Sequence, residues 1–369
     1  MTAAGQGDKA HLVPQPDQPL RRGWTTGACA TAAAKAAYAA LLHGDFPDPV
    51  EIILPRGERP AFALAEAGFL ADGRATAGVV KDAGDDPDVT HGALIRATVR
   101  KLPPGAGLVF RAGEGVGTVT LPGLPLPPGE PAINPVPRAM IAAALAELAG
   151  GAADAEVEIA IPGGEGLAER TMNPRLGILG GLSVLGTTGI VMPYSCSAWI
   201  HSIHRGIDVA RAAGLPHLAG ATGATSESAV QALYGLPEQA LIDMGDFVGG
   251  MLKYLRAHPV PRVTVAGGLA KLTKLAQGRL DLHSRRGAVD LAALAGLAQQ
   301  HGADAALAAR IARANTALEA FSLAAAEGVA LPQAVATAAR ATAAAAVEGT
   351  GIAVDIALFD RDGALLARA

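Results

Sequence analysis

The chain has 369 residues, of which 50% are hydrophobic and 17% are charged, and its formal net charge is −4. This balance is typical of a globular protein and excludes an intrinsically disordered one, and the length suffices for two domains with separate cores. Because the sequence contains no run of five or more basic residues, nucleic-acid binding has little support.

Cysteine usage and hydropathy indicate a cytoplasmic protein. Two cysteines, Cys29 and Cys196, fit a reducing compartment, and without a Cys-x-x-Cys pair they offer no structural zinc or iron–sulfur site. We expect Cys196 to be a buried thiol. Residues 1–19 lack the apolar run of a signal peptide and are predicted to form a disordered, polar tail. The Ala-rich region 288–347 is interrupted by charges, which favours packed helices and no membrane span.

Residues 20–180 are predicted to form an N-terminal α+β domain. One helix covers 24–43 and a second covers 137–149. Runs of β-forming residues, separated by clusters of Gly, Pro and Asp, predict a mixed or largely antiparallel sheet. The expected strands are 50–54, 61–69, 74–80, 92–100, 107–112, 117–123 and 155–161.

Residues 181–369 are predicted to form a Rossmann-like α/β domain. After a helix over 195–213, three strand–turn–helix units follow in succession, and this order favours a parallel, doubly wound sheet. Ala-rich helices come next, and the chain closes with a hairpin around Asp362 and Gly363. The expected strands of the three units are 215–220, 240–243 and 261–267, and the Ala-rich helices are 287–301, 303–327 and 331–346.

Glycine and polar residues follow two neighbouring strands of this sheet. Gly220, Thr222 and Gly223 surround the first turn, where backbone amides and a helix dipole can meet a carboxylate, ribose or phosphate. Asp243 ends the next strand, where an acid can accept both hydroxyls of a ribose. The structural alternatives are a plain turn and a helix cap. Because ligands of open parallel sheets bind beyond the carboxyl ends of the strands, these residues predict a ligand site.

The tripeptide Thr-Thr-Gly occurs twice, at residues 25–27 and at residues 187–189. In the first copy, Thr25 or Thr26 can cap the Ala-rich helix that follows. We expect Thr187 and Thr188 to lie at a helix start as well. A helix start made of Thr, Gly and free amides suits an anionic ligand, although a simple helix cap is the plainer interpretation.

Two groups of charged residues are further candidates. Asp85, Asp86, Asp88 and His91 form an acidic cluster that could hold a hard metal ion, but a loop whose Asp side chains bond to nearby amides is favoured. Basic residues follow the third strand. They could bind a ligand at the edge of the sheet, or they could simply form a solvated surface. This basic cluster comprises Lys271, Lys274, Arg279, His283, Arg285 and Arg286.

Several long sequence motifs, which follow one another in a fixed order, make the chain similar to one protein family. It resembles the cobalt-precorrin-5B C1-methyltransferases (CbiD family) of the anaerobic cobalamin pathway. One departure is Ala270, where the family often has glycine. The phrases are LRRGWTTGACATAAAKAA at 20–37, VVKDAGDDPDVTHGALI at 79–95, GEGVGTVTLPGL at 113–124, PAINPVPRAMI at 131–141, GGLSVLGTTGIVMPYS at 180–195, MGDFVGG at 244–250 and GGLAKLTKLAQGRLDLHS at 267–284.

The resemblance implies a reaction that the residues alone do not choose. S-adenosylmethionine would donate a methyl group to C1 of cobalt-precorrin-5B, a tetrapyrrole, giving cobalt-precorrin-6A and S-adenosylhomocysteine. The cobalt would arrive inside the substrate, so no protein-bound metal is expected. Two alternatives stay open: a nicotinamide-dependent oxidoreductase that acts on a tetrapyrrole, and a non-catalytic tetrapyrrole carrier. A homo-oligomer is also left open.

The candidate site residues form two sets, one for the methyl donor and one for the substrate. No catalytic residue is identified. The methyl donor is expected at Gly220, Thr222, Gly223, Asp243, Thr187 and Thr188. A corrin precursor carries many peripheral carboxylates, for which basic side chains and amides are suitable partners. The substrate is expected at Thr25, Thr26, Asp86, His91, Arg138, Lys271, Lys274, Arg279 and His283.

Overall fold

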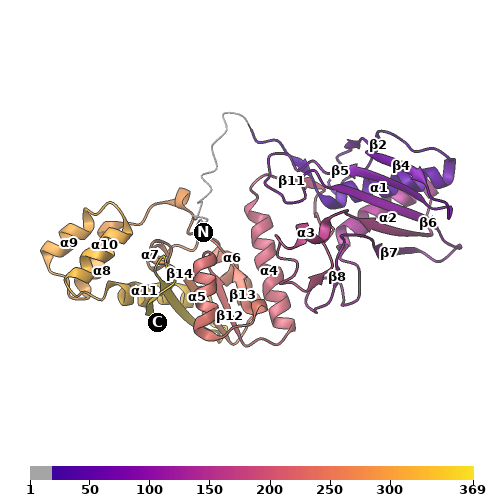
Figure 1. Ribbon diagram of the computed structural model, residues 1–369. Helices are drawn as coiled ribbons and strands as arrows, with labels where there is room; N and C mark the ends of the chain where they lie inside the picture. The colour runs from indigo at the N-terminus through magenta and orange to yellow at the C-terminus, as the bar shows by residue number, and fades with distance from the viewer. Residues whose placement is uncertain (1–18) are drawn as a thin grey trace, which may run out of the picture. The chain divides into compact units, whose positions relative to one another are not determined.

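The computed structural model describes residues 19–369, which form two compact units (Figure 1). Apart from Pro19, the predicted tail lies outside the described residues. The sequence suggested one boundary between residues 180 and 181, whereas the chain passes between the two units repeatedly. Unit 1 comprises residues 19–111, 136–162 and 184–194, and unit 2 comprises residues 112–135, 163–183 and 195–369.

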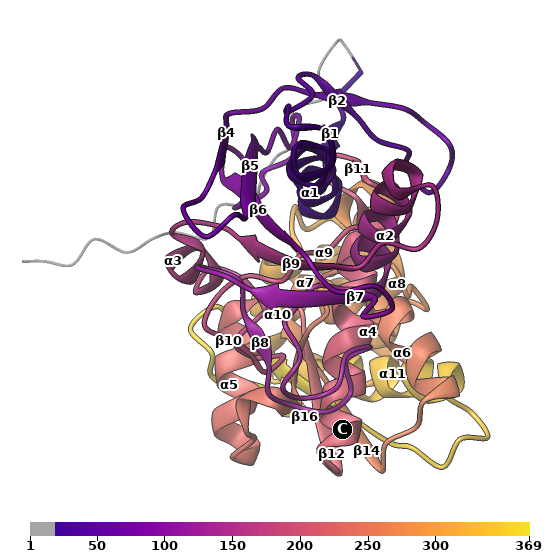
Figure 2. The same cartoon turned by 90° about the vertical axis from the view of Figure 1, so that its right-hand side faces the viewer.

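Helix α1 (Thr26–His43) forms the centre of unit 1. Every residue from Thr26 to Ala40 is buried, because small alanine side chains let the surrounding chain approach the helix on all sides. Figure 2 looks along this helix, which lies against strands β5 (Ala75–Val80) and β6 (Leu94–Lys101). The helix ends at Gly44, as predicted, and this residue has the left-handed conformation that favours glycine.

A five-stranded sheet with the order β4-β5-β6-β9-β7 packs on α1. The pairs β4–β5, β5–β6 and β6–β9 are antiparallel, as the sequence predicted. The remaining elements of unit 1 are smaller, and β2 pairs with β3. The bounds are β2 (Val50–Glu51), β3 (Ala61–Phe62), β4 (Glu66–Phe69), β7 (Leu108–Ala112), α2 (Pro135–Ala149) and β9 (Ala155–Ala160).

Three segments that are far apart in the sequence meet at the start of α1. Strand β1 (Gly23–Trp24) pairs antiparallel with β11 (Ile190–Val191). The Trp24 amide donates to the Asp82 carbonyl at 2.7 Å. At Gly23 the backbone of Ala83 approaches so closely that an added Cβ atom would overlap it. Position 23 therefore requires glycine because two backbone segments are in contact there.

Unit 2 contains two segments that the sequence placed in the N-terminal domain. The strand expected over 117–123 is reduced to β8 (Thr118–Val119), which pairs with β10 (Ile178–Leu179) and not with the sheet of unit 1. The extended run stops early because a turn follows, in which Gly123 has a φ of 105°. Helix α3 (Gly164–Ala168) belongs to the same part of the chain.

The main sheet of unit 2 has the order β13-β12-β14-β15-β16. The first four strands in this order are parallel, and β16 is antiparallel to β15. Both the three strand–turn–helix units and the terminal hairpin are therefore present as predicted. The strands are β12 (His217–Ala221), β13 (Leu241–Asp243), β14 (Arg262–Gly268), β15 (Ala353–Phe359) and β16 (Leu365–Arg368).

Both faces of this sheet are buried, as parallel strands require. Leu218 and Val265 face one core, whereas their neighbours Ala219 and Ala266 face another core with Val230 of the helix after β12. The alternation follows from the two-residue period of a strand. The helices and 3-10 turns of this region are α4 (Cys196–Ala212), α5 (Ala224–Tyr234), η1 (Glu238–Ala240), α6 (Val248–Ala257), α7 (Leu269–Ala276) and η2 (Ser284–Arg286).

The Ala-rich region forms four helices, and the single helix expected over 303–327 is wrong. The Thr316 hydroxyl accepts from the Glu319 amide at 3.1 Å, and the Glu319 carboxylate accepts from the Asn315 amide at 2.7 Å. This Thr-x-x-Glu pattern starts a new helix and was legible in the sequence. Among residues 19–369, no helix combines the length and the apolar character that a membrane crossing requires. The helices are α8 (Leu291–Gln300), α9 (Ala305–Ala312), α10 (Ala317–Ala326) and α11 (Leu331–Ala346).

We predict that Gly23→Ala destabilises unit 1, because the added methyl group would collide with the Ala83 backbone. The free energy of unfolding should fall by about 3 kcal/mol, the upper end for overpacking. Gly68→Ala is the matched control: it lies in strand β4, and an added Cβ would meet no atom within 4 Å. Calorimetry should show a lower unfolding temperature for the first variant only, and equal temperatures would contradict the prediction.

Candidate functional site

The first-turn amides of α1 are partly occupied by hydrogen bonds within the protein. Thr25 is the N-cap residue, and its hydroxyl accepts from the Ala28 amide at 3.2 Å. The Gly27 amide donates to the Leu185 carbonyl at 2.9 Å. Thr25 and Thr26 are both buried. Because the protein already uses two of the first-turn amides, this helix start does not form the open anion site that free amides would offer.

The second Thr-Thr-Gly copy does not start a helix, so that expectation is wrong. Thr187 and Thr188 precede strand β11, and the Thr188 hydroxyl accepts from the Ile190 amide at 3.2 Å. The Gly189 carbonyl accepts from the Thr25 amide at 3.0 Å. The two copies therefore come together in unit 1 through backbone pairing. The local sequence could not show this, because the β1–β11 ladder joins residues far apart in the chain.

The acidic cluster of unit 1 is a hydrogen-bonded loop, as the favoured interpretation predicted. Asp86 accepts from the Tyr194 amide at 2.8 Å, and Asp88 accepts from the Thr90 amide at 2.8 Å. Burial would raise the pKa of Asp88, but the ammonium group of Lys81 holds it below its usual value. Within residues 19–369, no three His, Cys, Asp or Glu side chains are grouped to hold a metal ion.

The other candidates of unit 1 have separate surroundings. The exposed ring of His91 accepts from the Ala83 amide through Nδ1 at 3.1 Å. The guanidinium group of Arg138 lies over the Phe110 ring, 5.1 Å from its centroid. The thiol expected to be buried, Cys196, is exposed at the start of α4 in unit 2, so that expectation is wrong. The buried thiol is Cys29, and burial raises its pKa to about 12, so it is no nucleophile at neutral pH.

The carboxyl ends of three parallel strands meet in unit 2. Ala221 at the end of β12 is paired with both Asp243 and Ala266, the registers that align β12 with β13 and β14. The Thr222 amide donates to the Ala266 carbonyl at 3.0 Å. The turns after β12, β13 and β14 therefore lie side by side, and we call this region the carboxyl edge. Ligands of open parallel sheets bind at such an edge.

Two of the predicted glycines have different roles at the carboxyl edge. Gly220 lies inside β12 and not in the turn, and an added Cβ would overlap the sulfur atom of Met251. Gly220 is therefore a packing residue, which corrects its predicted place in the loop. At Gly223 an added Cβ would meet no atom of the described chain within 4 Å. The turn at Thr222 and Gly223 is open, and a ligand could approach its backbone.

Helices α5, α6 and α7 follow β12, β13 and β14 and begin at the carboxyl edge. Within the described chain, α5, α6 and α7 have no side chain that caps their first amides. Helices α8, α9 and α10 are capped by Asp290, Asp304 and Thr316. Uncapped amides at a helix start attract negatively charged groups. Helices α3, α4 and α11 of unit 2 also lack a capping side chain, so missing caps are not special to the carboxyl edge. In α6 the first-turn amide of Gly249 already donates to the Leu280 carbonyl at 2.8 Å.

Acidic side chains at the carboxyl edge differ in whether they are paired. Glu227 of α5 accepts from both terminal nitrogens of Arg175, at 2.8 and 2.9 Å, and Asp246 forms an ion pair with Lys271. Among residues 19–369, the carboxylate of Asp243 receives no hydrogen bond from any side chain or amide. Burial raises the pKa of Asp243, and the charge of Glu227 raises it further, although Arg175 opposes this. Asp243 is thus a half-buried acceptor that lacks a donor.

The basic cluster does not present one open, cationic surface. The side chain of Lys274 is buried, and its amine donates to the Leu282 carbonyl at 3.0 Å. Burial lowers the pKa of Lys274. Lys271 keeps 35% of its side chain exposed beside Asp246, and Arg279 donates to the Ala288 carbonyl at 2.8 Å. His283 is half-buried in the same segment.

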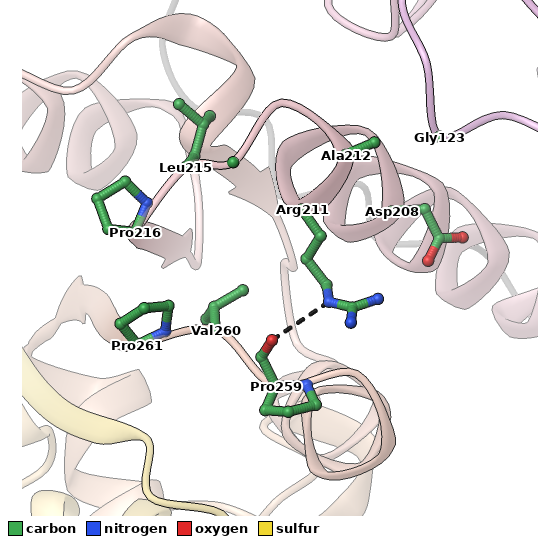
Figure 3. Close-up of a pocket in the computed structure, with 10 residues that line it drawn as sticks. Gly123, Asp208, Arg211, Ala212, Leu215, Pro216, Pro259, Val260 and Pro261 are labelled. Atoms are coloured by element: carbon green, nitrogen blue, oxygen red, sulfur yellow. Dashed lines mark hydrogen bonds between the residues drawn. The ribbon is translucent and has the colours of Figure 1, made fainter.

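A pocket of about 530 Å³ in unit 2 lies at the opposite edge of the sheet (Figure 3). Pro216 and Pro261, which line it, immediately precede β12 and β14, so the pocket lies at the amino ends of these strands. The side chain of Arg211 donates to the Pro259 carbonyl at 3.2 Å. Since ligands of parallel sheets bind at the other ends of the strands, this pocket is not the candidate site.

Sequence reasoning missed two residues that shape the carboxyl edge. Arg175 comes from the segment before β10, and its pKa is raised chiefly by its hydrogen bonds with Glu227. Trp199 of α4 donates through Nε1 to the Asp243 carbonyl at 3.0 Å. No local pattern marks either residue, because each reaches its partner only through tertiary packing.

The structure defines a mixed α/β protein with several sheets, one of which is a mainly parallel sheet in unit 2. The family model CbiD matches residues 13–193, and the model of the CbiD C-terminal domain matches residues 281–369. The chain is 65% identical over 357 residues to a cobalt-precorrin-5B C(1)-methyltransferase of Bradyrhizobium sp. (strain BTAi1), covering 95% of this chain and 94% of that protein. It is 66% identical over 349 residues to a protein of the same name from Agrobacterium fabrum (strain C58), covering 95% and 93%. The chain therefore belongs to the CbiD family.

One solved structure is also similar. It is a 1.9 Å crystal structure of cobalamin biosynthesis protein (cbiD) from Archaeoglobus fulgidus, with 27% sequence identity and a TM-score of 0.38. The similarity covers 68% of this chain and 77% of that chain. A TM-score this low supports no statement about the fold, so the family assignment depends on the sequence relatives.

We predict that Asp243→Asn stabilises the folded protein at pH 7. The pKa of Asp243 is raised on folding, so its ionised form lowers stability above the folded pKa, and this effect disappears below the unfolded pKa. The advantage of the variant should therefore shrink as the pH falls toward about 4, the usual value for Asp. Urea unfolding at several pH values measures it. Asp246→Asn is the matched control and should not stabilise, because it loses the ion pair with Lys271.

Proposed function

We propose that the protein transfers a methyl group from S-adenosylmethionine to C1 of cobalt-precorrin-5B, giving cobalt-precorrin-6A and S-adenosylhomocysteine. The observation that carries the proposal is the 65–66% identity to relatives of that name across nearly their whole length. The carboxyl edge of unit 2 adds support, because it offers groups that suit the parts of this donor. Cobalt belongs to the substrate, and the protein needs no metal of its own for this chemistry.

We place the ribose of the donor at Asp243 and its neighbouring groups along the turn at Thr222 and Gly223. Asp243 is an acceptor without a donor, and a ribose diol supplies two hydroxyl donors. The open backbone at Gly223 and the uncapped start of α5 suit the donor's carboxylate. Thr187 and Thr188, which the sequence suggested as donor ligands, lie in unit 1 just before β11, where the Thr188 hydroxyl accepts from the Ile190 amide.

The chemistry demands positioning more than a reactive side chain. An electron pair of the ring carbon forms the new C–C bond, the S–CH3 bond breaks, and its electrons stay on sulfur, which becomes a neutral thioether. Holding the two carbons at near-attack distance and in line can supply most of the acceleration. Neither cysteine is suited to be a nucleophile in this scheme, since Cys29 is buried and Cys196 has no adjacent base.

The substrate's carboxylates need cationic partners. Lys271 and Arg279 in unit 2 and Arg138 in unit 1 retain exposed or half-exposed guanidinium and ammonium groups. Lys274 is unsuited to this role, because its amine is buried against the Leu282 carbonyl. We therefore assign Lys274 to the stability of the segment after α7 and keep Lys271 and Arg279 of unit 2 as substrate ligands, while Arg138 stays a prediction from the sequence.

The decisive experiment supplies S-adenosylmethionine with a carbon-13 methyl group together with cobalt-precorrin-5B. We expect one labelled methyl group at C1 of the product, located by NMR, and one equivalent of S-adenosylhomocysteine. Calorimetry should show binding of S-adenosylhomocysteine and no binding of NAD. A protein that binds NAD and transfers no label would be the nicotinamide-dependent oxidoreductase, and one that binds the tetrapyrrole alone would be the carrier.

Asp243→Ala should weaken the binding of S-adenosylhomocysteine by about 1.5–3 kcal/mol, roughly 10- to 150-fold, the range for hydrogen bonds to a charged group. Circular dichroism should show an unchanged fold. Asp45→Ala is the control, because Asp45 is an exposed acid of unit 1. Calorimetric titration compares both variants with the parent protein. Equal affinities for all three proteins would move the ribose away from Asp243.

A further inference from the structure

We propose that a second pocket of unit 2, beside strand β13, receives the adenine ring of the methyl donor, with Trp199 as its aromatic wall. This inference rests on the proposed function and adds to it the position and the recognition of the base. The pocket has a volume of about 210 Å³. Its lining residues, all within unit 2, are Met172, Trp199, Ser202, Ile203, Gly206, Leu241, Ile242 and Asp243.

The position of the pocket follows from the strand order. Strand β13 is the outermost strand of the sheet, next to β12, so its outer side has no neighbouring strand. Helix α4 packs along that side and contributes four of the lining residues. Gly206 of α4 lets the helix approach the strand closely, since an added Cβ would lie 3.1 Å from the Ile242 side chain, and both residues line the pocket. The pocket is therefore a gap in the packing at the outer edge of the sheet.

The lining has the composition of a site for a flat, weakly polar ring. Met172, Ile203 and Leu241 supply apolar surface, and the hydroxyl group of Ser202 is a polar group on the wall. Small-molecule pockets typically combine apolar and aromatic walls with a few polar groups that fix orientation. A purine fits this pattern, since it has apolar faces and nitrogen atoms along its edge.

Trp199 is held in place and still uncovered. Its Nε1 donates to the Asp243 carbonyl at 3.0 Å, and its ring centroid lies 6.4 Å from that of Phe247. The side of the turn at Gly245 lies close to the indole ring, so that an added Cβ there would be 3.4 Å from it. Yet 47% of Trp199 is exposed. A fixed, exposed indole ring can stack on another aromatic ring without losing much conformational entropy.

Asp243 connects this pocket with the proposed ribose site. Asp243 lines the pocket, and it is the acid at the carboxyl edge whose carboxylate has no donor. In a nucleoside the base is bonded directly to the ribose. A ribose whose hydroxyls donate to Asp243 therefore carries its base next to Trp199. The acids at the other two places already have partners. Asp208, which lines the pocket at the amino ends of β12 and β14, pairs with Arg205 and Tyr254. Beside the basic cluster, Asp246 pairs with Lys271 and Asp281 with Arg286.

Fluorescence of Trp199 tests the contact directly. The chain has two tryptophans, Trp24 and Trp199, so Trp24→Phe leaves Trp199 as the single reporter. S-adenosylhomocysteine and 5′-methylthioadenosine share the adenosine group, whereas homocysteine lacks it. We expect the two adenosine compounds to change the Trp199 emission and homocysteine to leave it unchanged. Binding of S-adenosylhomocysteine by calorimetry without any change in emission would overturn the assignment.

A variant that fills the pocket provides the second measurement. Ser202→Met places a long side chain into the pocket from α4, and Ser197→Met is the matched control on the exposed first turn of the same helix. We expect Ser202→Met to weaken both adenosine compounds by about tenfold or more, since pockets discriminate strongly against added volume. Ser197→Met should bind them as the parent protein does. Unchanged affinity in a folded Ser202→Met protein would overturn the assignment.

The outcomes separate this inference from the proposed function. If the parent protein binds S-adenosylhomocysteine but neither the Trp199 emission nor the Ser202→Met affinity changes, the base lies elsewhere and the methyltransferase proposal stands. If the parent protein does not bind S-adenosylhomocysteine, both are overturned. Should Ser202→Met fail to fold, by circular dichroism, the emission of Trp199 in the Trp24→Phe protein decides the matter alone.

Discussion

The parallel pairing of β12 with β13 on one side and β14 on the other is the constraint on which the candidate site depends. It places Ala221 beside both Asp243 and Ala266, so the three following turns share one edge. A parallel sheet must also be covered on both faces, and the connecting helices that cover it begin at this same edge. The position of the starts of α5, α6 and α7 at one edge is thus a consequence of topology.

The carboxyl edge contains one charged side chain, Asp243, that lowers the stability of the folded protein. Glu227 and Asp246 have cationic partners, but Asp243 is half-buried beside Glu227 without a donor of its own. Burying an unpaired carboxylate lowers stability unless something donates to it. Such an arrangement is typical of positions kept for a ligand. Trp199, bonded to the backbone of the same residue, adds a fixed aromatic surface to this position.

Unit 1 shows that repeated sequence need not mean repeated structure. The first Thr-Thr-Gly caps a helix, and the second leads into strand β11. What joins them is the contact between their backbones, from Thr25 to Gly189 and from Gly27 to Leu185. These bonds consume amides that would otherwise suit an anion. The phrases that most strongly suggested a ligand site therefore also have a structural explanation.

The sequence by itself determined the elements whose patterns are local: the buried α1, the three strand–turn–helix units, the terminal hairpin and the position of Asp243 at a strand end. The sequence also indicated the family, because several long motifs of that family occur in it in the same order. Only the tertiary structure decided which residues are accessible. Lys274 is buried, Gly220 packs against Met251, and Arg175 reaches Glu227 from a distant segment. Exposure and pairing depend on chain segments that meet only after folding, and no local pattern contains them.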